Sequence, residues 1–408
     1  MVFFGLIGFF MFFPNKKKVL ALIVLGIVIG WILSKYFKKI IVFQIILALI
    51  SIISFTPKLI FHLNFDNASW ATITKEEQQT KFIETPNIFV IQPDGYVNFS
   101  EIDKPPYDFD NSKFENWLVS QGFRDYEGFR SNYYSTYTSN SSMFAMQHHY
   151  YSNTNKATLK THKANEVIIG KKNNVTNILK QNGYNNYLIT DNTYFLINRE
   201  PMHYDYCNVK PSMVSYHRSG VLPKLDFMDG FEKTLDTITT DKNFFFIERT
   251  IPGHIIYKKG LSKGKEEERL LYLDALKRTN QWLKEMISSI TSFDENALIV
   301  IVADHGGYVG LDYTMEVTER KPNELEVISS FSSILSIKWP ESLKTNDLIF
   351  KSNVNLFRKL FFALSKNAHL VNNLKENSSY LPLKISGETD FYEYIDDSGK
   401  PVFNKVYN

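Results

Sequence analysis

A carboxylate and an imidazole stand side by side at Asp304-His305, after an apolar run and before two glycines. Both side chains are good ligands for zinc, manganese or iron. The seven residues before them, ALIVIVA, are typical of a strand buried on both faces of a parallel sheet. Ligands of open α/β sheets bind beyond the carboxyl ends of the strands, so the pair is expected where chemistry occurs. A surface turn with an incidental histidine is the alternative interpretation.

Three further features stand where chemistry is expected: Asp94 after the apolar run 87–92, a hydroxyl-rich run at 135–142, and His254 after the apolar run 243–248. A divalent metal held by two carboxylates and a histidine neutralises an anionic substrate and polarises the atom under attack. It also lowers the pKa of a hydroxyl, so that Ser or Thr can act as a nucleophile. At a helix start, backbone N–H groups also favour a phosphate or sulfate. His254 could bind an anionic oxygen or protonate a leaving group.

Strands and helices alternate along the part of the chain that carries these residues. We predict strands at 87–92, 187–190, 243–248 and 297–303, and helices at 112–122, 176–182, 266–290 and 354–364. Residues 192–226 are expected to form loops over the site, and residues 396–399 a turn in a polar tail. This alternation indicates one α/β domain at 84–408, preceded by a polar connector at 64–83.

The N-terminal residues 1–63 have the composition of a membrane segment. Their apolar blocks are Met1–Pro14, Val19–Ser34 and Ile40–Pro57, separated by lysines. A membrane-spanning helix needs roughly 20 apolar residues. We therefore predict two to three transmembrane helices, with at least two in the mature protein. The lysine clusters at 16–18 and 35–39 carry equal charge, so they do not fix the sidedness.

Charge and cysteine content exclude several classes of protein. The chain has 46 basic and 43 acidic residues, but seven lysines lie in residues 1–63, which leaves 39 basic and 43 acidic residues in the remainder. The basic character belongs to the membrane segment, so no nucleic-acid partner is expected. The single cysteine, Cys207, excludes an internal disulfide framework and a multi-cysteine metal site.

The order of these pieces resembles that of the alkaline phosphatase and sulfatase superfamily: strand and Asp, hydroxyl at a helix start, strand and His, then strand and DHG. With N-terminal membrane helices, the chain looks most like the membrane-anchored phosphoethanolamine and phosphoglycerol transferases. The resemblance covers roughly residues 84–365. It implies an α/β fold with an alkaline-phosphatase-like, mostly parallel sheet flanked by helices, behind transmembrane helices.

The resemblance also implies a set of site residues. Asp94, Thr136, Asp304 and His305 would hold one divalent metal, with zinc preferred and manganese as the alternative. The nucleophile of many relatives is followed three residues later by Ser, which matches Thr136 among the hydroxyls of this run. The resemblance implies that His254 binds the phosphate of the substrate.

Three neighbouring hydroxyls remain alternatives to Thr136 as the nucleophile: Ser135, Thr138 and Ser139. True sulfatases of the superfamily carry a Cys or Ser within Cys/Ser-x-Pro-x-Arg, which is oxidised to formylglycine. No residue of this chain satisfies that motif, so sulfate-ester hydrolysis by that route is not expected.

The resemblance implies transfer of a phosphoethanolamine or phosphoglycerol group through a phospho-threonine. The donor would be a membrane phospholipid and the acceptor a surface glycan or glycolipid. The protein would lie in a bacterial inner membrane as a multi-pass protein, with the catalytic domain on the outer, periplasmic or extracellular face. The alternatives are a phosphodiesterase or phosphatase of the same superfamily and an inactive, membrane-tethered binding protein.

Overall fold

A computed structural model of the chain describes residues 16–64, 69–149, 161–197, 199, 201–215, 220–222, 225–343, 348–385 and 388–406. The chain divides into two compact units, Met1–Asp66 and Asn67–Asn408. The catalytic residues that the sequence predicts all belong to the second unit.

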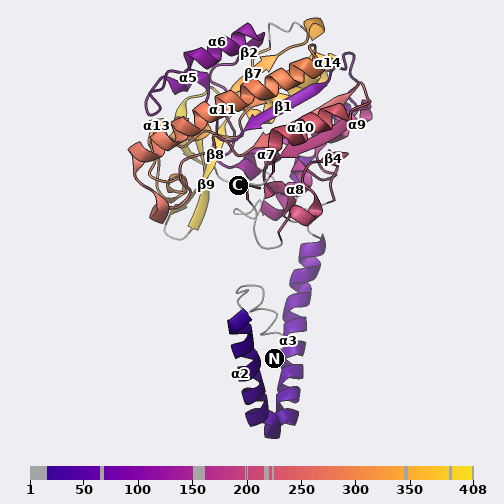
Figure 1. Ribbon diagram of the computed structural model, residues 1–408, viewed down its shortest axis with the longest axis vertical. Coiled ribbons are helices and arrows are strands. Elements are labelled where there is room, and N and C mark those ends of the chain that lie inside the picture. Colours follow the sequence, from indigo (N-terminus) through magenta and orange to yellow (C-terminus); the bar gives the residue numbers. More distant parts are fainter. Residues whose placement is uncertain are drawn as a thin grey trace. The chain divides into compact units, whose positions relative to one another are not determined.

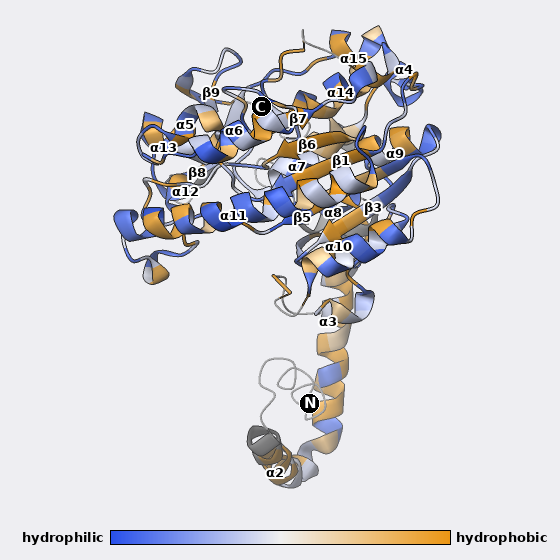
Figure 2. Ribbon diagram, turned by 45° about the horizontal axis from the view of Figure 1, so that its top comes forward, coloured by the Kyte–Doolittle hydropathy of each residue, from blue (hydrophilic) through white to orange (hydrophobic). Residues whose placement is uncertain are grey.

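The N-terminal unit contains two apolar helices, α2 (Lys16–Leu33) and α3 (Phe37–Asn64), joined by the 3-10 helix η1 (Ser34–Tyr36). Figure 2 shows both helices as mostly hydrophobic. Among the residues that the structure describes, one helical stretch, Ile23–Ile60, is long and apolar enough to cross a membrane, with a mean hydropathy of 2.4. This single stretch gives no support to a multi-pass arrangement. The apolar block Met1–Pro14 lies outside the described residues.

The second unit is built on a seven-stranded sheet with the order β2-β7-β6-β1-β5-β3-β4. Neighbours from β6 to β4 pair in parallel, and β7 runs against both β6 and β2. The strands are β1 (Ile88–Pro93), β2 (Phe123–Asp125), β3 (Asn185–Thr190), β4 (Tyr206–Cys207), β5 (Asn243–Arg249), β6 (Leu298–Val302) and β7 (Leu335–Lys338).

Alternate residues of the central strands face two separate cores, one on each side of the sheet. Phe89 and Ile91 of β1 pack in the core that includes α6, α10 and α11, whereas Ile88 and Val90 pack with α7, α9 and α14. Figure 1 shows α10 and α11 on the same side of the sheet. These helices are α6 (Ser112–Ser120), α7 (Thr136–Ala145), α9 (Asn174–Gln181), α10 (Phe227–Asp236), α11 (Lys265–Phe293) and α14 (Leu356–Ser365).

Shorter helices and a second sheet complete the unit. The short helices are α4 (Lys75–Gln78), α5 (Phe99–Ile102), α8 (Thr161–Ile168), α12 (Glu316–Glu319), α13 (Glu324–Phe331) and α15 (Ala368–Asn372). The second sheet is antiparallel with the order β10-β9-β8, formed by β8 (Ser379–Ile385), β9 (Glu388–Ile395) and β10 (Pro401–Lys405). The predicted turn at 396–399 is confirmed: it joins β9 to β10, and the backbone N–H of Gly399 donates to the carbonyl oxygen of Asp396. The tail is not polar throughout, because apolar residues of β8 and β9 join the core beside α12 and α13.

The predicted fold class is confirmed: a mostly parallel sheet is flanked by helices on both faces. The four predicted strands correspond to β1, β3, β5 and β6, with ends that differ by one or two residues. The predicted loop region 192–226 contains one strand that was not expected, β4, which pairs with β3 at the edge of the sheet.

Candidate active site

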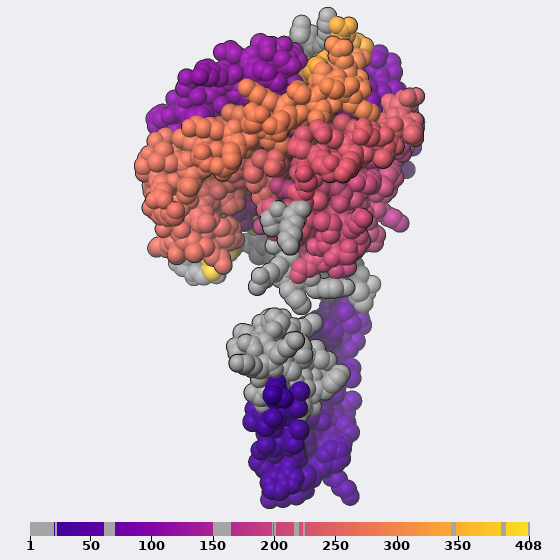
Figure 3. Space-filling view, in the orientation of Figure 1, coloured from indigo at the N-terminus to yellow at the C-terminus, as the bar shows by residue number. Residues whose placement is uncertain are grey.

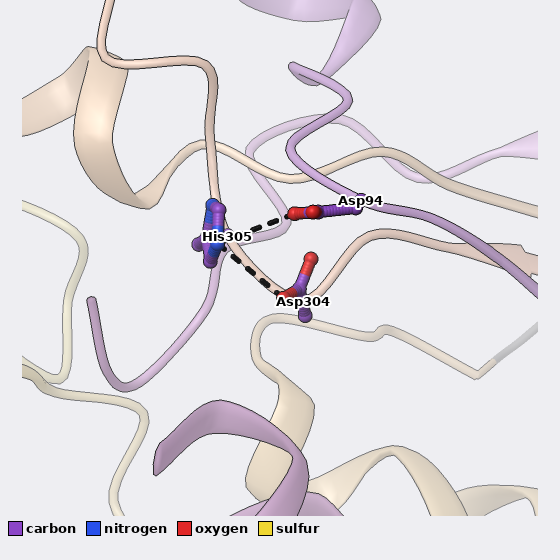
Figure 4. A group of neighbouring side chains, drawn as sticks. All are labelled: Asp94, Asp304 and His305. Carbon is purple, nitrogen blue, oxygen red and sulfur yellow. Dashed lines mark ion pairs between the residues drawn. The ribbon is translucent and has the colours of Figure 1, made fainter. Parts of the chain in front are cut away.

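The predicted site residues meet at the carboxyl ends of three neighbouring strands. Asp94 follows β1, Asp304 follows β6, and His254 lies in the loop after β5. Because β6, β1 and β5 are adjacent and parallel, their ends lie at one edge of the sheet. Figure 4 shows the side chains of Asp94, Asp304 and His305 pointing toward one another.

Two glycines allow the turns after these strands to pack backbone against backbone. Gly95 has a φ of +69°, and a Cβ there would lie 2.2 Å from the carbonyl oxygen of Gly253. A Cβ on Gly306 would lie 2.1 Å from the carbonyl oxygen of Ser329. No real Cβ tolerates such distances from a backbone oxygen, so both positions require glycine. Gly95 therefore allows the Asp94 turn to lie against the His254 loop, and Gly306 allows the DHG turn to lie against the end of α13.

The imidazole of His305 is the centre of the cluster. Its Nε2 lies 3.4 Å from Oδ1 of Asp94, 3.4 Å from Oδ2 of Asp304 and 3.4 Å from Oγ1 of Thr136. Its Nδ1 lies 2.9 Å from the carbonyl oxygen of Gly306. A carbonyl oxygen can only accept, so we assign the ring proton to Nδ1. This tautomer leaves the lone pair of Nε2 toward the carboxylates, as a metal ligand requires.

The two carboxylates have the properties of metal ligands. Oδ1 of Asp304 accepts a hydrogen bond from the backbone N–H of Gly95, at 3.3 Å. Oδ2 of Asp304 and Oδ1 of Asp94 are buried and accept no hydrogen bond from the described residues. Burial, together with the carboxylates of Asp304 and Asp191, raises the pKa of Asp94 well above its ordinary value. Buried anionic oxygens without donors are unfavourable unless a cation neutralises them.

The cluster can therefore hold a divalent metal. One ligand atom each from Asp94, Asp304 and His305 lies within 4.8 Å of the others. Two carboxylates and one imidazole suit zinc or manganese.

Thr136 is the first residue of α7, and its hydroxyl faces the cluster. Of the alternatives, Ser135 and Thr138 bind each other, with their hydroxyl oxygens 2.8 Å apart. Ser139 is buried, and its hydroxyl donates to the carbonyl oxygen of Tyr133 at 2.7 Å. Of these four hydroxyls, the structure brings that of Thr136 to His305.

His254 lies beside the cluster, with its ring centroid 5.9 Å from that of His305. Its Nδ1 lies 2.6 Å from the carbonyl oxygen of Ile255 and 3.0 Å from the hydroxyl oxygen of Thr314. Burial and the neighbouring His305 lower its pKa to about 4. We assign the proton to Nδ1, which leaves Nε2 as the nitrogen that can contact a substrate.

Two further buried acids lie at the same edge and were not predicted from the sequence. Asp191 follows β3, and Glu248 lies near the end of β5. Oε2 of Glu248 accepts hydrogen bonds at 2.6 Å from the hydroxyl of Thr190 and from Nδ2 of Asn192. Burial and the carboxylate of Asp191 raise the pKa of Glu248 well above its ordinary value. The signal that could have found both residues is an acid at the end of an apolar strand.

Of the described residues, His148, His149, His369 and Cys207 lie outside this cluster. The rings of His149 and Tyr133 stack with centroids 3.9 Å apart, and Nδ1 of His148 lies 2.9 Å from the hydroxyl of Tyr133. His369 lies in α15, and Cys207 lies in the edge strand β4.

Comparison with known proteins identifies the family. The sulfatase family model matches residues 126–326. The chain therefore carries a sulfatase domain of the alkaline phosphatase and sulfatase superfamily at these residues, as the sequence motifs predict. The matched range contains Thr136, His254 and Asp304-His305, whereas Asp94 precedes it. No curated protein sequence matches the chain.

Solved structures with the same fold are distant in sequence. BT4656, in complex with its substrate D-glucosamine-2-N,6-O-disulfate, has a TM-score of 0.50 and 11% identity, over 79% of this chain and 91% of BT4656. The C-terminal periplasmic domain of EcEptC from Escherichia coli has a TM-score of 0.49 and 11% identity, over 73% of this chain and 90% of that domain. The corresponding domain of the phosphoethanolamine transferase EptC from Campylobacter jejuni has a TM-score of 0.43 and 14% identity, over 72% of this chain and 96% of that domain.

Proposed function

We propose that this protein is a membrane-anchored, metal-dependent phosphotransferase that moves a phosphoethanolamine or phosphoglycerol group from a phospholipid to a surface glycan or glycolipid. The observation that carries the proposal is the 3.4 Å approach of the Thr136 hydroxyl to Nε2 of His305, between two buried carboxylates. This is an arrangement for a nucleophile that acts without a separate base.

The site residues have separate roles in this proposal. Asp94, Thr136, Asp304 and His305 would hold one divalent ion, zinc or manganese. A bound divalent ion supplies Lewis-acid polarisation and neutralises the charge of the phosphate. The backbone N–H of Gly95 keeps the Asp304 carboxylate oriented, because it donates to Oδ1. The first turn of α7 adds N–H groups and a favourable dipole for an anionic group at Thr136.

The reaction runs as two displacements at phosphorus. In the first, the hydroxyl oxygen of Thr136 loses its proton and bonds to phosphorus, and the bond from phosphorus to the diacylglycerol oxygen breaks. That oxygen takes up a proton and leaves as diacylglycerol. In the second, an acceptor hydroxyl loses its proton and bonds to phosphorus, and Thr136 leaves and regains its proton. His254 would bind an anionic phosphate oxygen through Nε2, since a phosphate next to the ring favours its protonated form.

The membrane stretch Ile23–Ile60 supports a lipid donor, because it keeps the chain at the bilayer. We place the protein in a bacterial inner membrane with the catalytic domain on the outer face. Accessibility of an introduced surface cysteine to a membrane-impermeant reagent in intact spheroplasts tests this location. Labelling only after the membrane is broken would contradict it.

Thr136→Ala tests the proposed chemistry. We expect a loss of at least about 10³-fold in turnover, because the attacking oxygen is absent. Thr136→Ser keeps the hydroxyl and should retain activity, so it is the matched control. The assay measures transfer from a labelled phospholipid to a glycan acceptor in membranes that contain the full chain. Release of the free head group with or without acceptor would identify a hydrolase, and unchanged turnover in Thr136→Ala would refute the proposed nucleophile.

A further inference from the structure

A short surface segment follows the His254 loop and remains outside the mechanism described above. Its five residues, Tyr257–Leu261, have the sequence YKKGL and are all exposed, with Tyr257 at 50% and Leu261 at 63%. We call this segment the YKKGL loop. Figure 3 shows the chain that leads into α11 at the surface of its unit. A cluster of two lysines between an aromatic and a leucine side chain needs an explanation when all of it faces solvent.

The base of the YKKGL loop is held rigidly. Glu268 is buried, and its two carboxylate oxygens accept from the backbone N–H groups of Ile256, at 2.9 Å, and Lys263, at 3.1 Å. The backbone N–H of Thr314 donates to the carbonyl oxygen of Ile256 at 2.9 Å. One buried carboxylate thus ties both ends of the loop to the first turn of α11. The exposed tip therefore projects from a fixed base.

The charge of the tip is not balanced locally. Beyond the tip, Lys263 pairs with Glu267 at 2.9 Å, and Lys265 pairs with Glu326 at 3.5 Å. Within the described part of the chain, no acidic side chain forms an ion pair with Lys258 or Lys259. The tip therefore presents two positive charges together with a tyrosine and a leucine. This combination fits an anionic surface with an apolar layer beneath it, which is the interface of a phospholipid bilayer.

The YKKGL loop also begins close to the catalytic site. Tyr257 stands three residues after His254 in the same loop. The hydroxyl oxygen of Thr314 lies 3.0 Å from Nδ1 of His254, and the backbone N–H of Thr314 donates to the carbonyl oxygen of Ile256 at 2.9 Å. Thr314 thus holds the base of the YKKGL loop beside the histidine of the site.

We propose that the YKKGL loop docks on a bilayer surface that contains anionic phospholipid and holds the head group of the lipid donor at the mouth of the site. Lys258 and Lys259 would contact lipid phosphates, while Tyr257 and Leu261 enter the interface. The donor specificity rests on the proposed function, whereas the docking of the loop does not. Membrane-surface lysines each contribute to binding, so removal of two should weaken lipid engagement about tenfold or more.

A fluorescence experiment tests the docking without any assay of activity. The full chain carries Leu261→Cys in a Cys207→Ser background, is labelled with an environment-sensitive dye, and is placed in nanodiscs. We expect a blue shift of emission with phosphatidylglycerol nanodiscs relative to pure phosphatidylcholine. The control label is at Val119→Cys, a position 59% exposed on α6, and should not shift. Equal emission of the Leu261→Cys label in both lipids would overturn the proposal, as would the same shift with a soluble anionic glycan in detergent.

A kinetic experiment tests the effect on the donor. The double variant Lys258→Ser/Lys259→Ser should lose about tenfold in turnover of a membrane phospholipid and retain turnover of a soluble nitrophenyl phosphodiester. The control Lys113→Ser/Lys171→Ser removes the same charge from exposed positions elsewhere and should change neither rate. Unchanged phospholipid turnover in the loop variant would overturn the proposal.

The variant Thr136→Ala shows whether the docking proposal or the proposed function has failed. If Thr136→Ala retains turnover of both substrates, the proposed chemistry fails, while the fluorescence result still decides whether the loop docks. If Thr136→Ala abolishes both rates and the loop variant changes neither, the docking proposal alone fails.

Discussion

Four buried acids lie at the same edge of the central sheet, and they fall into two unlike pairs. Asp94 and Asp304 each keep one buried oxygen without a hydrogen-bond donor among the described residues, and both face Nε2 of His305. Asp191 and Glu248 accept hydrogen bonds from neighbouring side chains instead. Both pairs are buried at strand ends, so position in the fold does not separate them.

The two pairs differ in whether hydrogen-bond donors satisfy their carboxylate oxygens. Oδ1 of Asp191 accepts from the hydroxyl of Thr250 at 2.9 Å and from its backbone N–H at 3.1 Å. Asn192 donates to Glu248 and to the hydroxyl of Thr250, so it links the two acids into one network. A satisfied buried network makes a region rigid, whereas unsatisfied carboxylate oxygens favour a cation. We therefore propose the first pair as the metal ligands and the second pair as a support for the loops beside them.

The largest difference between the pairs should appear when one acid is made neutral without a change of shape. Asp304→Asn removes an anionic ligand, so we expect turnover to fall more than about 100-fold, beyond the effect typical of residues that only support ligands. A phosphotransfer assay with added zinc or manganese measures the loss. Activity within about threefold of the parent would show that Asp304 holds no essential cation.

The comparison also depends on the backbone contacts that hold the DHG turn, and with it Asp304, against the end of α13. In Gly306→Ala the new Cβ meets two carbonyl oxygens, those of Ser329 and Ser332, which cannot move without displacing the backbone. We expect a loss of about 2–4 kcal/mol in unfolding free energy. Gly230→Ala is the control, because open space surrounds that position in α10 and the substitution should be neutral or stabilising. Equal denaturation midpoints for the two variants would contradict the account.

Buried histidines provide a pH test that lies outside the metal cluster. Burial lowers the pKa of His148 to about 4, and burial and the neighbouring His148 lower the pKa of His149 to about 3. In the unfolded chain both titrate near 6.5. Above about pH 6.5 the two histidines are neutral in the folded and in the unfolded chain, so they do not reduce the unfolding free energy there. As the pH falls from 6.5 toward 4, the unfolded chain binds more protons, and each histidine lowers the unfolding free energy by about 1.4 kcal/mol per pH unit.

His149→Gln should reduce this acid dependence, as measured by denaturant unfolding at pH 7, 6 and 5. His369→Gln is the control, since His369 is exposed and should leave the slope unchanged. An identical slope in His149→Gln and in the parent would refute the role of the buried ring.

The smallest effect is expected for the matched substitution in the second pair. Burial and the carboxylate of Asp191 raise the pKa of Glu248, which favours its uncharged form. Glu248→Gln keeps the shape of the side chain and an oxygen that can accept from Thr190 and Asn192, so turnover should change by less than about threefold. A loss comparable to that of Asp304→Asn would show that the two pairs act as one ionic site.

Sequence patterns predicted the centre of the fold better than its edges. The apolar runs of β1, β5 and β6 are long and buried on both faces, so the strands and their polar ends were evident. The strands β4, with two residues, and β2, with three, are too short to show an apolar run or an alternation in the sequence. Their pairing depends on strands that are distant in sequence. The alternation in β9, ETDFYEYI, is a strand signal, but its partners only become clear in the folded chain.

The site was predictable for the same reason and to the same extent. Each of Asp94, His254 and Asp304 directly follows a strong strand or lies in the loop after it, so the rule for strand ends found them. Spacing could not distinguish Thr136 from the hydroxyl residues beside it. In the folded chain the Thr136 hydroxyl faces His305, whereas the neighbouring hydroxyls form hydrogen bonds within or next to the helix start. Asp191 directly follows the predicted strand 187–190, so the same rule applies to it, but its hydrogen bonds from Thr250 appear only in the folded chain.

The most direct test of the account is the metal content of the full chain, purified in detergent and measured by elemental analysis alongside Asp304→Asn and Glu248→Gln. We predict about one zinc or manganese per chain in the parent and in Glu248→Gln, and a metal-free Asp304→Asn. A parent that binds no divalent metal under any loading condition, or an Asp304→Asn variant that keeps it, would contradict the assignment of Asp94, Asp304 and His305 as the metal site.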